Sequence, residues 1–244
     1  MAEAHRPPRV LVVGLGGLGC PAAAILARVP EVELWLCDDD VVDETNLHRQ
    51  ILYRDSDVGR DKLEAAREIL IASGADPARL VPVRSRLLPE NARSLLRQVD
   101  LVLEGSDNFA TKFLAADAAH LEAKPVVHGA AVRWVGTAWA VSPTGAPCYR
   151  CLFEDVPPGA QQGCSEAGVM GPVVGLCGAL LADLALRVLG GDASAFGSLY
   201  TYDGQRDQLR QVSAARRPGC PLCGSSPTIV EIEELRYTAP SCAA

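Results

Sequence analysis

Short apolar runs alternate with segments of helical periodicity over the first 130 residues of the chain. Residues 9–14 and 32–37 are almost entirely apolar, which is typical of strands buried on both faces of a parallel sheet. Residues 17–28 lie between them and show helical spacing, so the three segments form one βαβ unit. The same alternation continues with strands at 79–84, 99–103 and 125–130 and helices at 60–73, 89–97 and 108–121. It predicts a doubly wound, mainly parallel Rossmann-like α/β sheet.

The pattern changes after residue 130. Residues 131–143 alternate like antiparallel strands, and residues 153–168 are rich in Pro, Gly and Gln, which predicts an exposed loop. The rest of the chain supplies a long apolar helix at 169–189, strands at 198–203 and 207–213, and one more strand at 227–237. Antiparallel strands are therefore expected to extend the parallel sheet.

Composition narrows the functional classes. The 244 residues are 48% hydrophobic and 22% charged, with a net charge of −7. Neither nucleic acid nor an anionic membrane attracts an acidic surface, so we expect neither as a partner. Residues 1–9 have no apolar signal segment, and the longest uncharged stretch, 167–182, is too short to span a bilayer. We interpret it as a buried helix of a cytoplasmic protein.

A glycine-rich turn follows the first predicted strand, with Gly14, Gly16, Gly17 and Gly19 in the sequence GLGGLG. Such a turn lets backbone N–H groups approach a phosphate and lets the following helix pack closely on the strand. Asp38 closes the second strand, where an acidic side chain meets a ribose hydroxyl pair. The pattern predicts a nucleotide site, and it fits a dinucleotide and an adenosine nucleotide equally well.

Polar side chains outside the turn favour a triphosphate. The stretch DDDVVDETNLHRQ and the start of the next helix supply Asp40, Asn46, Arg49, Gln50 and Lys62. A triphosphate carries about four negative charges, so its transfer calls for Arg and Lys side chains together with Mg²⁺. Arg49 or Lys62 alone reads more simply as solvated surface charge, but together with the turn they predict an ATP site.

Asp107 and Asn108 follow the buried strand 99–103 in the sequence EGSDNFATKF. The carboxyl end of a parallel strand faces the crevice in which doubly wound sheets bind ligands. The carboxylate of Asp107 is therefore a candidate to hold Mg²⁺. An equally weighted alternative is that Ser106 or Asp107 caps the helix that follows.

Two C-x-x-C motifs, CYRC and CPLC, lie far apart in the chain and supply Cys148, Cys151, Cys220 and Cys223. Four thiolates suit tetrahedral Zn²⁺, and because the protein fills all four positions the metal is structural. A thioredoxin-like redox pair would need only one such motif. The sequence therefore predicts a Zn(Cys)₄ site that ties distant segments together.

Cys164 stands in the polar sequence QGCSEAG, within the predicted loop. A cysteine in such a loop is either chemically active or a spectator thiol, and its neighbours leave both readings open. Cys20, Cys37 and Cys177 lie in apolar segments and are predicted to be packing residues. The histidines show no spacing typical of metal ligands.

Taken in order, GLGGLG, DETNLHRQ, VGRDK, SDN, the paired C-x-x-C motifs and CSEAGVMGP resemble the MoeB/ThiF/HesA family, the bacterial relatives of ubiquitin-activating enzymes. The resemblance covers residues 9 to about 237. The family uses MgATP to adenylate the C-terminal Gly-Gly carboxylate of a small ubiquitin-like sulfur-carrier protein of the ThiS/MoaD type, and it releases pyrophosphate. The resemblance implies one adenylation domain over 1–244, with a nucleotide-binding half at 9–130 and a carrier-binding half at 131–244.

The resemblance also implies roles for individual residues. Asp38 would bind the ribose, Asn46, Arg49 and Lys62 the phosphates, and Asp107 the Mg²⁺. Cys164 matches a cysteine in the crossover loop 153–168 that takes part in thioester or acyl-disulfide formation in some members and is dispensable in others. A homodimer is implied as well, with a sulfurtransferase or cysteine desulfurase as a further partner.

Two positions depart from the family pattern. Members usually begin with a longer helical arm that sends an arginine into the partner subunit's ATP site, and here Arg6 is the candidate within residues 1–9. Thr137 stands where many members have Gln.

Two other functions fit part of the pattern. An NAD-dependent oxidoreductase leaves the basic residues and the zinc site unexplained, and a nucleotide-binding scaffold would dock a small protein without chemistry.

Overall fold

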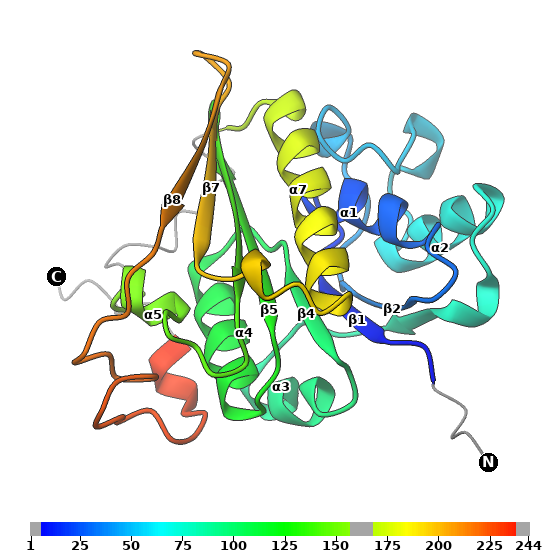
Figure 1. The fold of residues 1–244 in the computed structure, drawn as a ribbon. Helices are drawn as coiled ribbons and strands as arrows, with labels where there is room; N and C mark the ends of the chain where they lie inside the picture. Colours follow the sequence, from blue (N-terminus) through cyan, green and yellow to red (C-terminus); the bar gives the residue numbers. More distant parts are fainter. Residues whose placement is uncertain (1–5, 157–167, 238–244) are drawn as a thin grey trace, which may run out of the picture.

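The protein is described by a computed structural model that covers residues 6–156 and 168–237. Its strands form one sheet in the order β3-β2-β1-β4-β5-β6-β7-β8 (Figure 1). Pairing is parallel from β3 to β5 and antiparallel from β5 to β8. The strands are β1 Arg9–Val13, β2 Glu33–Cys37, β3 Leu80–Val83, β4 Leu101–Glu104, β5 Val126–Val132, β6 Val135–Val141, β7 Ser198–Asp203 and β8 Gln208–Ser213. The predicted parallel sheet with an antiparallel extension is confirmed.

Helices cover both faces of the sheet (Figure 1). The α-helices are α1 Gly19–Leu26, α2 Lys62–Ala72, α3 Pro89–Leu96, α4 Phe109–Leu121, α5 Tyr149–Leu152 and α7 Gly171–Leu189. The 3₁₀ turns are η1 Glu44–Asn46, η2 Asp55–Asp57, η3 Pro77–Arg79, η4 Ala193–Ala195 and η5 Glu234–Tyr237. Residues of α1, α2 and α7 share one buried apolar cluster, and residues of α3, α4 and α5 share the other.

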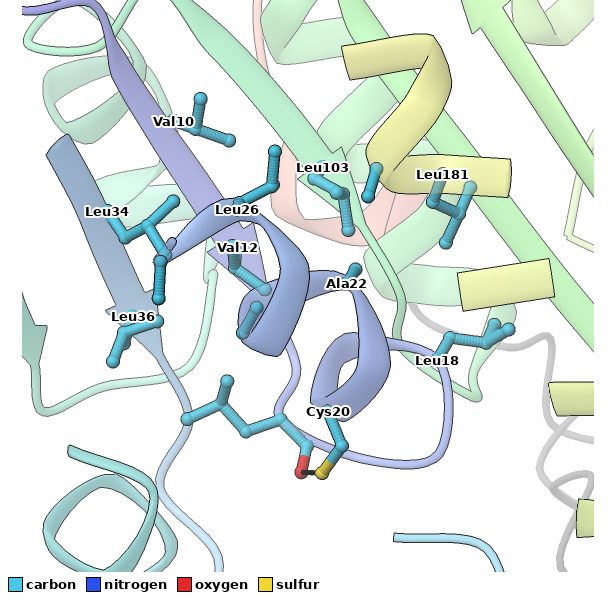
Figure 2. Close-up of a cluster of buried hydrophobic side chains, with 14 of the residues drawn as sticks. Val10, Val12, Leu18, Cys20, Ala22, Leu26, Leu34, Leu36, Leu103 and Leu181 are labelled. Atoms are coloured by element: carbon cyan, nitrogen blue, oxygen red, sulfur yellow. Dashed lines mark hydrogen bonds between the residues drawn. The ribbon is translucent and has the colours of Figure 1, made fainter. Parts of the chain in front are cut away.

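The first cluster fixes α1 against the sheet. Figure 2 shows Ala22 and Leu26 of α1 among side chains of β1, β2 and β4, with Leu181 of α7 beside them. The thiol of Cys20 donates a hydrogen bond to the carbonyl of Leu15 over 3.2 Å. Cys20, Cys37 and Cys177 are all buried, as predicted for packing residues. This packing sets the position of the glycine turn that precedes α1.

Local sequence explains where several helices begin and end. The Asp61 side chain accepts a hydrogen bond from the Glu64 amide at the start of α2, and Pro89 opens α3. Both are favoured at helix N-termini, since Asp satisfies a free amide and Pro has none to satisfy. Gly74 follows α2 with a φ of +100°, a conformation in which glycine avoids the strain that a Cβ would cause.

The long helix predicted at 169–189 is α7. Among the described residues it is the one helix long and apolar enough, by length and composition alone, to cross a membrane. It packs against α1, β5 and β6, and its buried side includes Val173, Cys177, Leu181 and Leu184. A helix that packs on a sheet can be as apolar as a membrane-spanning helix, because its buried face contacts apolar side chains.

The strand predicted at 227–237 is wrong. The amides of Thr228 and Ile229 donate to the carbonyl of Pro221 over 2.8 and 2.9 Å, and the last four residues form η5. Ile229 and Tyr237 are buried in the second apolar cluster. The alternating pattern therefore reflects side chains that pack against the second C-x-x-C segment, and none of the described strands pairs with residues 227–237.

Candidate nucleotide-binding site

A cavity of about 490 Å³ lies at the carboxyl ends of the parallel strands. All but one of the residues predicted to bind the nucleotide line this cavity, and Gly19 lies behind the turn. They are Gly14, Gly16, Gly17, Asp38, Asp40, Asn46, Arg49, Gln50, Lys62, Asp107 and Asn108. The loops after β1, β2 and β4 meet here because parallel strands end at the same edge of the sheet.

The glycine turn needs its glycines for space and conformation. Gly14 has a φ of +87°, and its amide donates to the Cys37 carbonyl over 2.9 Å. A Cβ at Gly19 would lie 1.8 Å from the Gly14 carbonyl oxygen. A Cβ at Gly17 would lie 2.8 Å from the side chain of Val174. The backbone therefore forms the cavity wall, and α1 starts without a side-chain cap. Such a wall suits an anionic ligand.

Asp38 joins this turn to the end of β2. Its carboxylate accepts hydrogen bonds from the amides of Leu15 over 2.6 Å and Asp40 over 2.9 Å. Burial raises the pKa of Asp38, and the nearby charge of Lys62 and these two amides oppose that rise. The side chain is fixed beside the cavity, where its oxygens suit hydroxyl donors of a sugar.

Lys62 is the first residue of α2 and is almost completely buried. Its Nζ lies 3.1 Å from Oδ2 of Asp40, and the guanidinium of Arg86 reaches both Asp39 and Asp40. Arg86 also lines the cavity. Arg86 was not predicted from the sequence, since it follows β3 without any motif around it. Basic and acidic side chains therefore alternate along this wall of the cavity, from Lys62 through Asp40 to Arg86.

Asn46, the last residue of η1, lines the cavity together with Arg49 and Gln50, which lie beside Gly17 and Gly16 of the glycine turn. The Arg49 guanidinium donates to Oδ1 of Asn46 over 2.5 Å and lies 3.5 Å from Nε2 of His48. Gln50 is 4% exposed, and its Oε1 is buried without a partner among the described residues. An unsatisfied buried acceptor is costly, so a donor supplied by a ligand or water would stabilise it.

Asp107 and Asn108 differ in their contacts within the described ranges. The Asn108 side chain accepts from the Thr111 amide over 2.8 Å and caps α4, so neither Ser106 nor Asp107 is the cap. Asp107 is exposed at the cavity and makes no hydrogen bond or ion pair within the described ranges. A carboxylate with no partner of its own suits a hard cation such as Mg²⁺.

A buried ionic cluster contacts the Ser106–Asp107 turn through Ser106. The Glu104 carboxylate accepts from Lys112 Nζ over 2.9 Å, from His128 Nδ1 over 3.2 Å and from the Ser106 amide over 2.8 Å. Burial disfavours its charge, but these partners outweigh burial and lower the pKa of Glu104 to about 2. Burial lowers the pKa of His128. The sequence analysis missed this cluster, although Glu104 and Lys112 interrupt otherwise apolar segments.

The four motif cysteines meet beside the second apolar cluster, on the side of the sheet that α3, α4 and α5 cover. Their sulfur atoms all lie within 4.8 Å of one another. Cys148 is 3.4 Å from Cys220, and Cys151 is 3.4 Å from Cys223. Tetrahedral zinc with bonds of about 2.3 Å would place the sulfurs roughly 3.8 Å apart. The cluster is therefore suited to a metal ion, and the donor set matches Zn²⁺.

A second buried ion pair connects this cysteine cluster to α4. The Arg150 guanidinium, between Cys148 and Cys151, donates to both oxygens of Asp117 over 2.8 to 3.1 Å. The Tyr237 hydroxyl donates to Asp117 over 3.0 Å. This network explains how segments far apart in the chain hold the cluster together.

Arg6 does not line the nucleotide cavity of its own chain. Arg6 pairs with Asp100 over 2.6 Å, just before β4 and thus at the amino edge of the sheet. The family's arm reaches the ATP site of the partner subunit, so a role of Arg6 in that site stays a prediction. Cys164 lies outside the described residues, together with most of the predicted crossover loop.

Known proteins match most of the chain. It is 39% identical over 237 residues to the SAMP-activating enzyme E1 of Haloferax volcanii, covering 96% of this chain and 86% of that protein. It is 42% identical over 233 residues to the sulfur carrier protein adenylyltransferase of Thermus thermophilus, covering 91% and 84%. It is 37% identical over 237 residues to the adenylyltransferase and sulfurtransferase MOCS3 of Danio rerio. That match covers 96% of this chain and about half, 51%, of MOCS3.

Solved structures share the fold. The crystal structure of Escherichia coli MccB with ATP has a TM-score of 0.74 at 20% identity, covering 90% of this chain and 67% of MccB. MccB with N-formylated MccA has a TM-score of 0.76 at 20% identity, covering 90% and 68%. The model of the ThiF family matches residues 3–222. With nine-tenths of its length matched in this way, the chain belongs to the ThiF family.

Proposed function

We propose that the protein activates the C-terminal Gly-Gly carboxylate of a small ubiquitin-like sulfur-carrier protein as an acyl-adenylate, with ATP as the second substrate. The observation that carries the proposal is the convergence of Arg49, Lys62 and Asp107 on a cavity walled by a phosphate-binding turn. Two cations and an unpartnered carboxylate exceed what a dinucleotide pyrophosphate needs. The names of the matched relatives, which include sulfur carrier protein adenylyltransferase, support the same reaction.

ATP lies along the carboxyl edge of the sheet in this proposal. The turn at Gly14 to Gly17 receives the phosphates, Asp38 binds the ribose, and Arg49 and Lys62 neutralise phosphate charge. Gln50 supplies a buried acceptor oxygen beside the turn. These groups are already in place around the cavity, so little reorganisation is needed when the nucleotide binds.

The carrier carboxylate attacks the α-phosphorus of ATP. A bond forms between the carboxylate oxygen and phosphorus, and the bond from the α-phosphorus to its bridging oxygen breaks. Pyrophosphate leaves with that electron pair. The attacking carboxylate is already ionised at neutral pH, so no general base is required. Arg49 and Lys62 stabilise the charge that gathers on the phosphate oxygens in the transition state.

Asp107 holds Mg²⁺ in this scheme. Its carboxylate lines the cavity and is unpartnered in the described part of the chain, and oxygen donors are the ligands that Mg²⁺ prefers. When bound, the ion neutralises charge on the phosphate oxygens. Asn108 keeps the turn in place by capping α4, while Asp107 lines the cavity.

An exposed apolar patch beside the cavity is where the folded part of the carrier docks. It consists of Val132, Trp134 and Val135 at the β5–β6 hairpin and Met170 beside it, each 37 to 44% exposed. The Met170 amide donates to the Arg133 carbonyl, and the preceding residues Gly168 and Val169 line the cavity. An apolar patch continuous with an active-site cavity suits a protein substrate whose tail enters that cavity.

Zn²⁺ is proposed at Cys148, Cys151, Cys220 and Cys223. Four protein thiolates leave no position for water, so the metal would be structural and would tie α5 to the segment after β8. In keeping with the family resemblance, we further propose a cytoplasmic homodimer that works with a sulfurtransferase or cysteine desulfurase. Cys164 is the proposed site of any covalent carrier intermediate.

Pyrophosphate exchange into ATP tests the proposal. The exchange is expected with a ubiquitin-like carrier that ends in Gly-Gly, and it should disappear when the last glycine is removed. No exchange at all would exclude the proposed reaction and leave a nucleotide-binding scaffold, and exchange that does not depend on the carrier would exclude the carrier as the substrate. Thermal melting adds a second comparison. MgATP should raise the melting temperature and NADH should not, whereas the reverse would favour an oxidoreductase.

A further inference from the structure

The ionic cluster below Asp107 has no part in the reaction as proposed so far. Glu104 at the end of β4 is completely buried, and Lys112 on α4 and His128 on β5 are 5% and 4% exposed. Burying charges in a protein interior costs free energy that an apolar side chain would not cost. Three polar side chains placed together under the ligand cavity therefore call for a reason beyond packing.

Every oxygen of the Glu104 carboxylate has two donors. Oε1 accepts from the amide of Ser106 over 2.8 Å and from its hydroxyl over 2.5 Å. Oε2 accepts from Lys112 Nζ and from His128 Nδ1. A carboxylate with four donors is held in one orientation. Its two hydrogen bonds with Ser106 therefore also fix the position of Ser106, which immediately precedes Asp107.

Lys112 extends the cluster to the next wall of the cavity. Its Nζ donates to the Gly129 carbonyl over 2.5 Å, and the next two residues of β5, Ala130 and Ala131, line the cavity. Lys112 lines it too. The turn after β4 and the end of β5 are thus joined through one ammonium group.

The Asp117–Arg150 pair provides an internal contrast. Asp117 lies on the same helix α4, is also completely buried, and also meets a basic side chain. Its partners, Arg150 and Tyr237, belong to the cysteine cluster side of the molecule, and none of the three lines the nucleotide cavity. A buried charge on α4 therefore does not by itself contact the nucleotide cavity. The Glu104 cluster contacts it through Ser106 and Lys112, which both line the cavity.

We propose that Glu104, held by Lys112, is a positioning residue for Asp107. It fixes the Ser106–Asp107 turn in the orientation that receives the divalent cation of the nucleotide. This inference rests on the proposed function, because it takes Asp107 as the carboxylate that meets the metal. Glu104 itself touches neither metal nor substrate.

The test compares ATP binding with and without Mg²⁺ by calorimetry in the wild-type protein and in Glu104→Gln. An amide offers one acceptor oxygen and places an NH₂ group against existing donors, so the turn loses its fixed orientation. We expect unchanged affinity for ATP in EDTA. The Mg²⁺ concentration that half-saturates the gain in affinity should rise about 10- to 100-fold, the usual effect of removing a residue that orients a metal ligand.

A further variant keeps the test decisive. Ser106→Ala removes one of the two bonds from Ser106 without changing a buried charge. It should show a smaller shift in the same direction even where Glu104→Gln fails to fold.

Asp117→Asn is the matched control. It removes an equally buried carboxylate charge, from the helix α4 that also carries Lys112, and should lower the melting temperature while the Mg²⁺ dependence stays at the wild-type value. The inference is overturned when Glu104→Gln, or Ser106→Ala in its place, retains the wild-type Mg²⁺ dependence, or when Asp117→Asn shifts it equally. Failure of the wild-type protein to bind ATP at all would instead overturn the proposed function, and this inference with it.

Discussion

The Nζ atom of Lys62 lies 3.1 Å from Oδ2 of Asp40 at the wall of the nucleotide cavity. The Lys62 side chain is 6% exposed, whereas the Asp40 side chain is 52% exposed. The ammonium group is therefore already held at the cavity, and a phosphate that enters competes with Asp40 for it. A cation oriented before the ligand binds costs little reorganisation at the moment of reaction.

Lys62→Ala is expected to lower kcat/KM for carrier-dependent pyrophosphate exchange by about 10²- to 10³-fold, the range found when one donor to a developing charge is removed. Arg84→Ala is the control, because Arg84 is exposed and pairs with Asp61 and Glu64 away from the cavity lining. It should retain wild-type exchange. Equal exchange by both variants would remove Lys62 from the proposed site.

Arg49→Ala and Asp107→Ala should each abolish formation of the carrier adenylate without unfolding the protein. Arg49 is only partly buried and Asp107 is exposed, so neither truncation leaves a cavity in the core. Carrier adenylate is followed by mass spectrometry, and folding by circular dichroism. Glu90→Ala, an exposed carboxylate in the first turn of α3, should be indistinguishable from wild type. Wild-type activity in either site variant would refute the assignment of that residue.

Gly19→Ala should destabilise the fold and abolish ATP binding together. Its Cβ would lie 1.8 Å from the Gly14 carbonyl oxygen, so α1 or the turn must move. Overpacking of this kind costs about 1–3 kcal/mol or more. Gly175→Ala on α7 meets no atom within 4 Å and should be neutral or stabilise the helix by up to about 1 kcal/mol. Urea unfolding measures the stability of both variants, and calorimetry measures their affinity for ATP. ATP binding by Gly19→Ala at wild-type affinity would contradict the proposed role of the turn.

Metal removal should lower stability and leave the nucleotide cavity intact. We expect one zinc per chain by elemental analysis, and a lower melting temperature after treatment with a strong chelator, because binding at such sites is coupled to folding. Cys220→Ser should lose the zinc. Cys177→Ala, which replaces a buried cysteine outside the cluster, should keep it. Purified wild-type protein without zinc but with unchanged stability would contradict a structural metal.

Glu104 should also leave a signature in the pH dependence of stability. Its pKa is held at about 2, below the ordinary 4.5, so its stabilisation is present above pH 4.5 and is lost as pH falls toward 2. The shift corresponds to roughly 3 kcal/mol. Lys112 and His128 face Glu104 and are present in both wild type and Glu104→Gln. The difference in free energy of unfolding between the two should therefore shrink below pH 4.5, and a constant difference would contradict the lowered pKa.

The sequence was sufficient to predict many of the cavity residues, although not Arg86, because parallel strands end at one edge and several candidates follow a strand or open a helix. Gly14, Asp38 and Asp107 meet for that reason. It was not sufficient to predict contacts between buried side chains on neighbouring elements. Glu104, Lys112 and His128 are each isolated in apolar segments, and only the parallel register of β4 and β5 brings Glu104 beside His128.

The segment 227–237 illustrates the opposite error. Its alternation of apolar and polar residues is real, since Ile229 and Tyr237 are buried. Alternation alone does not supply a partner strand, and the amides of Thr228 and Ile229 donate hydrogen bonds to the Pro221 carbonyl. A pattern of side chains therefore predicts burial more securely than it predicts backbone pairing.

Intact-mass spectrometry of the carrier tests the proposed adenylation most directly. A ubiquitin-like carrier ending in Gly-Gly is incubated with the protein, MgATP and pyrophosphatase, with a carrier lacking the last glycine as control. The account predicts a mass gain of one adenylate group on the Gly-Gly carrier alone, and its loss with Asp107→Ala. An unmodified carrier, while the protein binds MgATP and the carrier, would contradict the account.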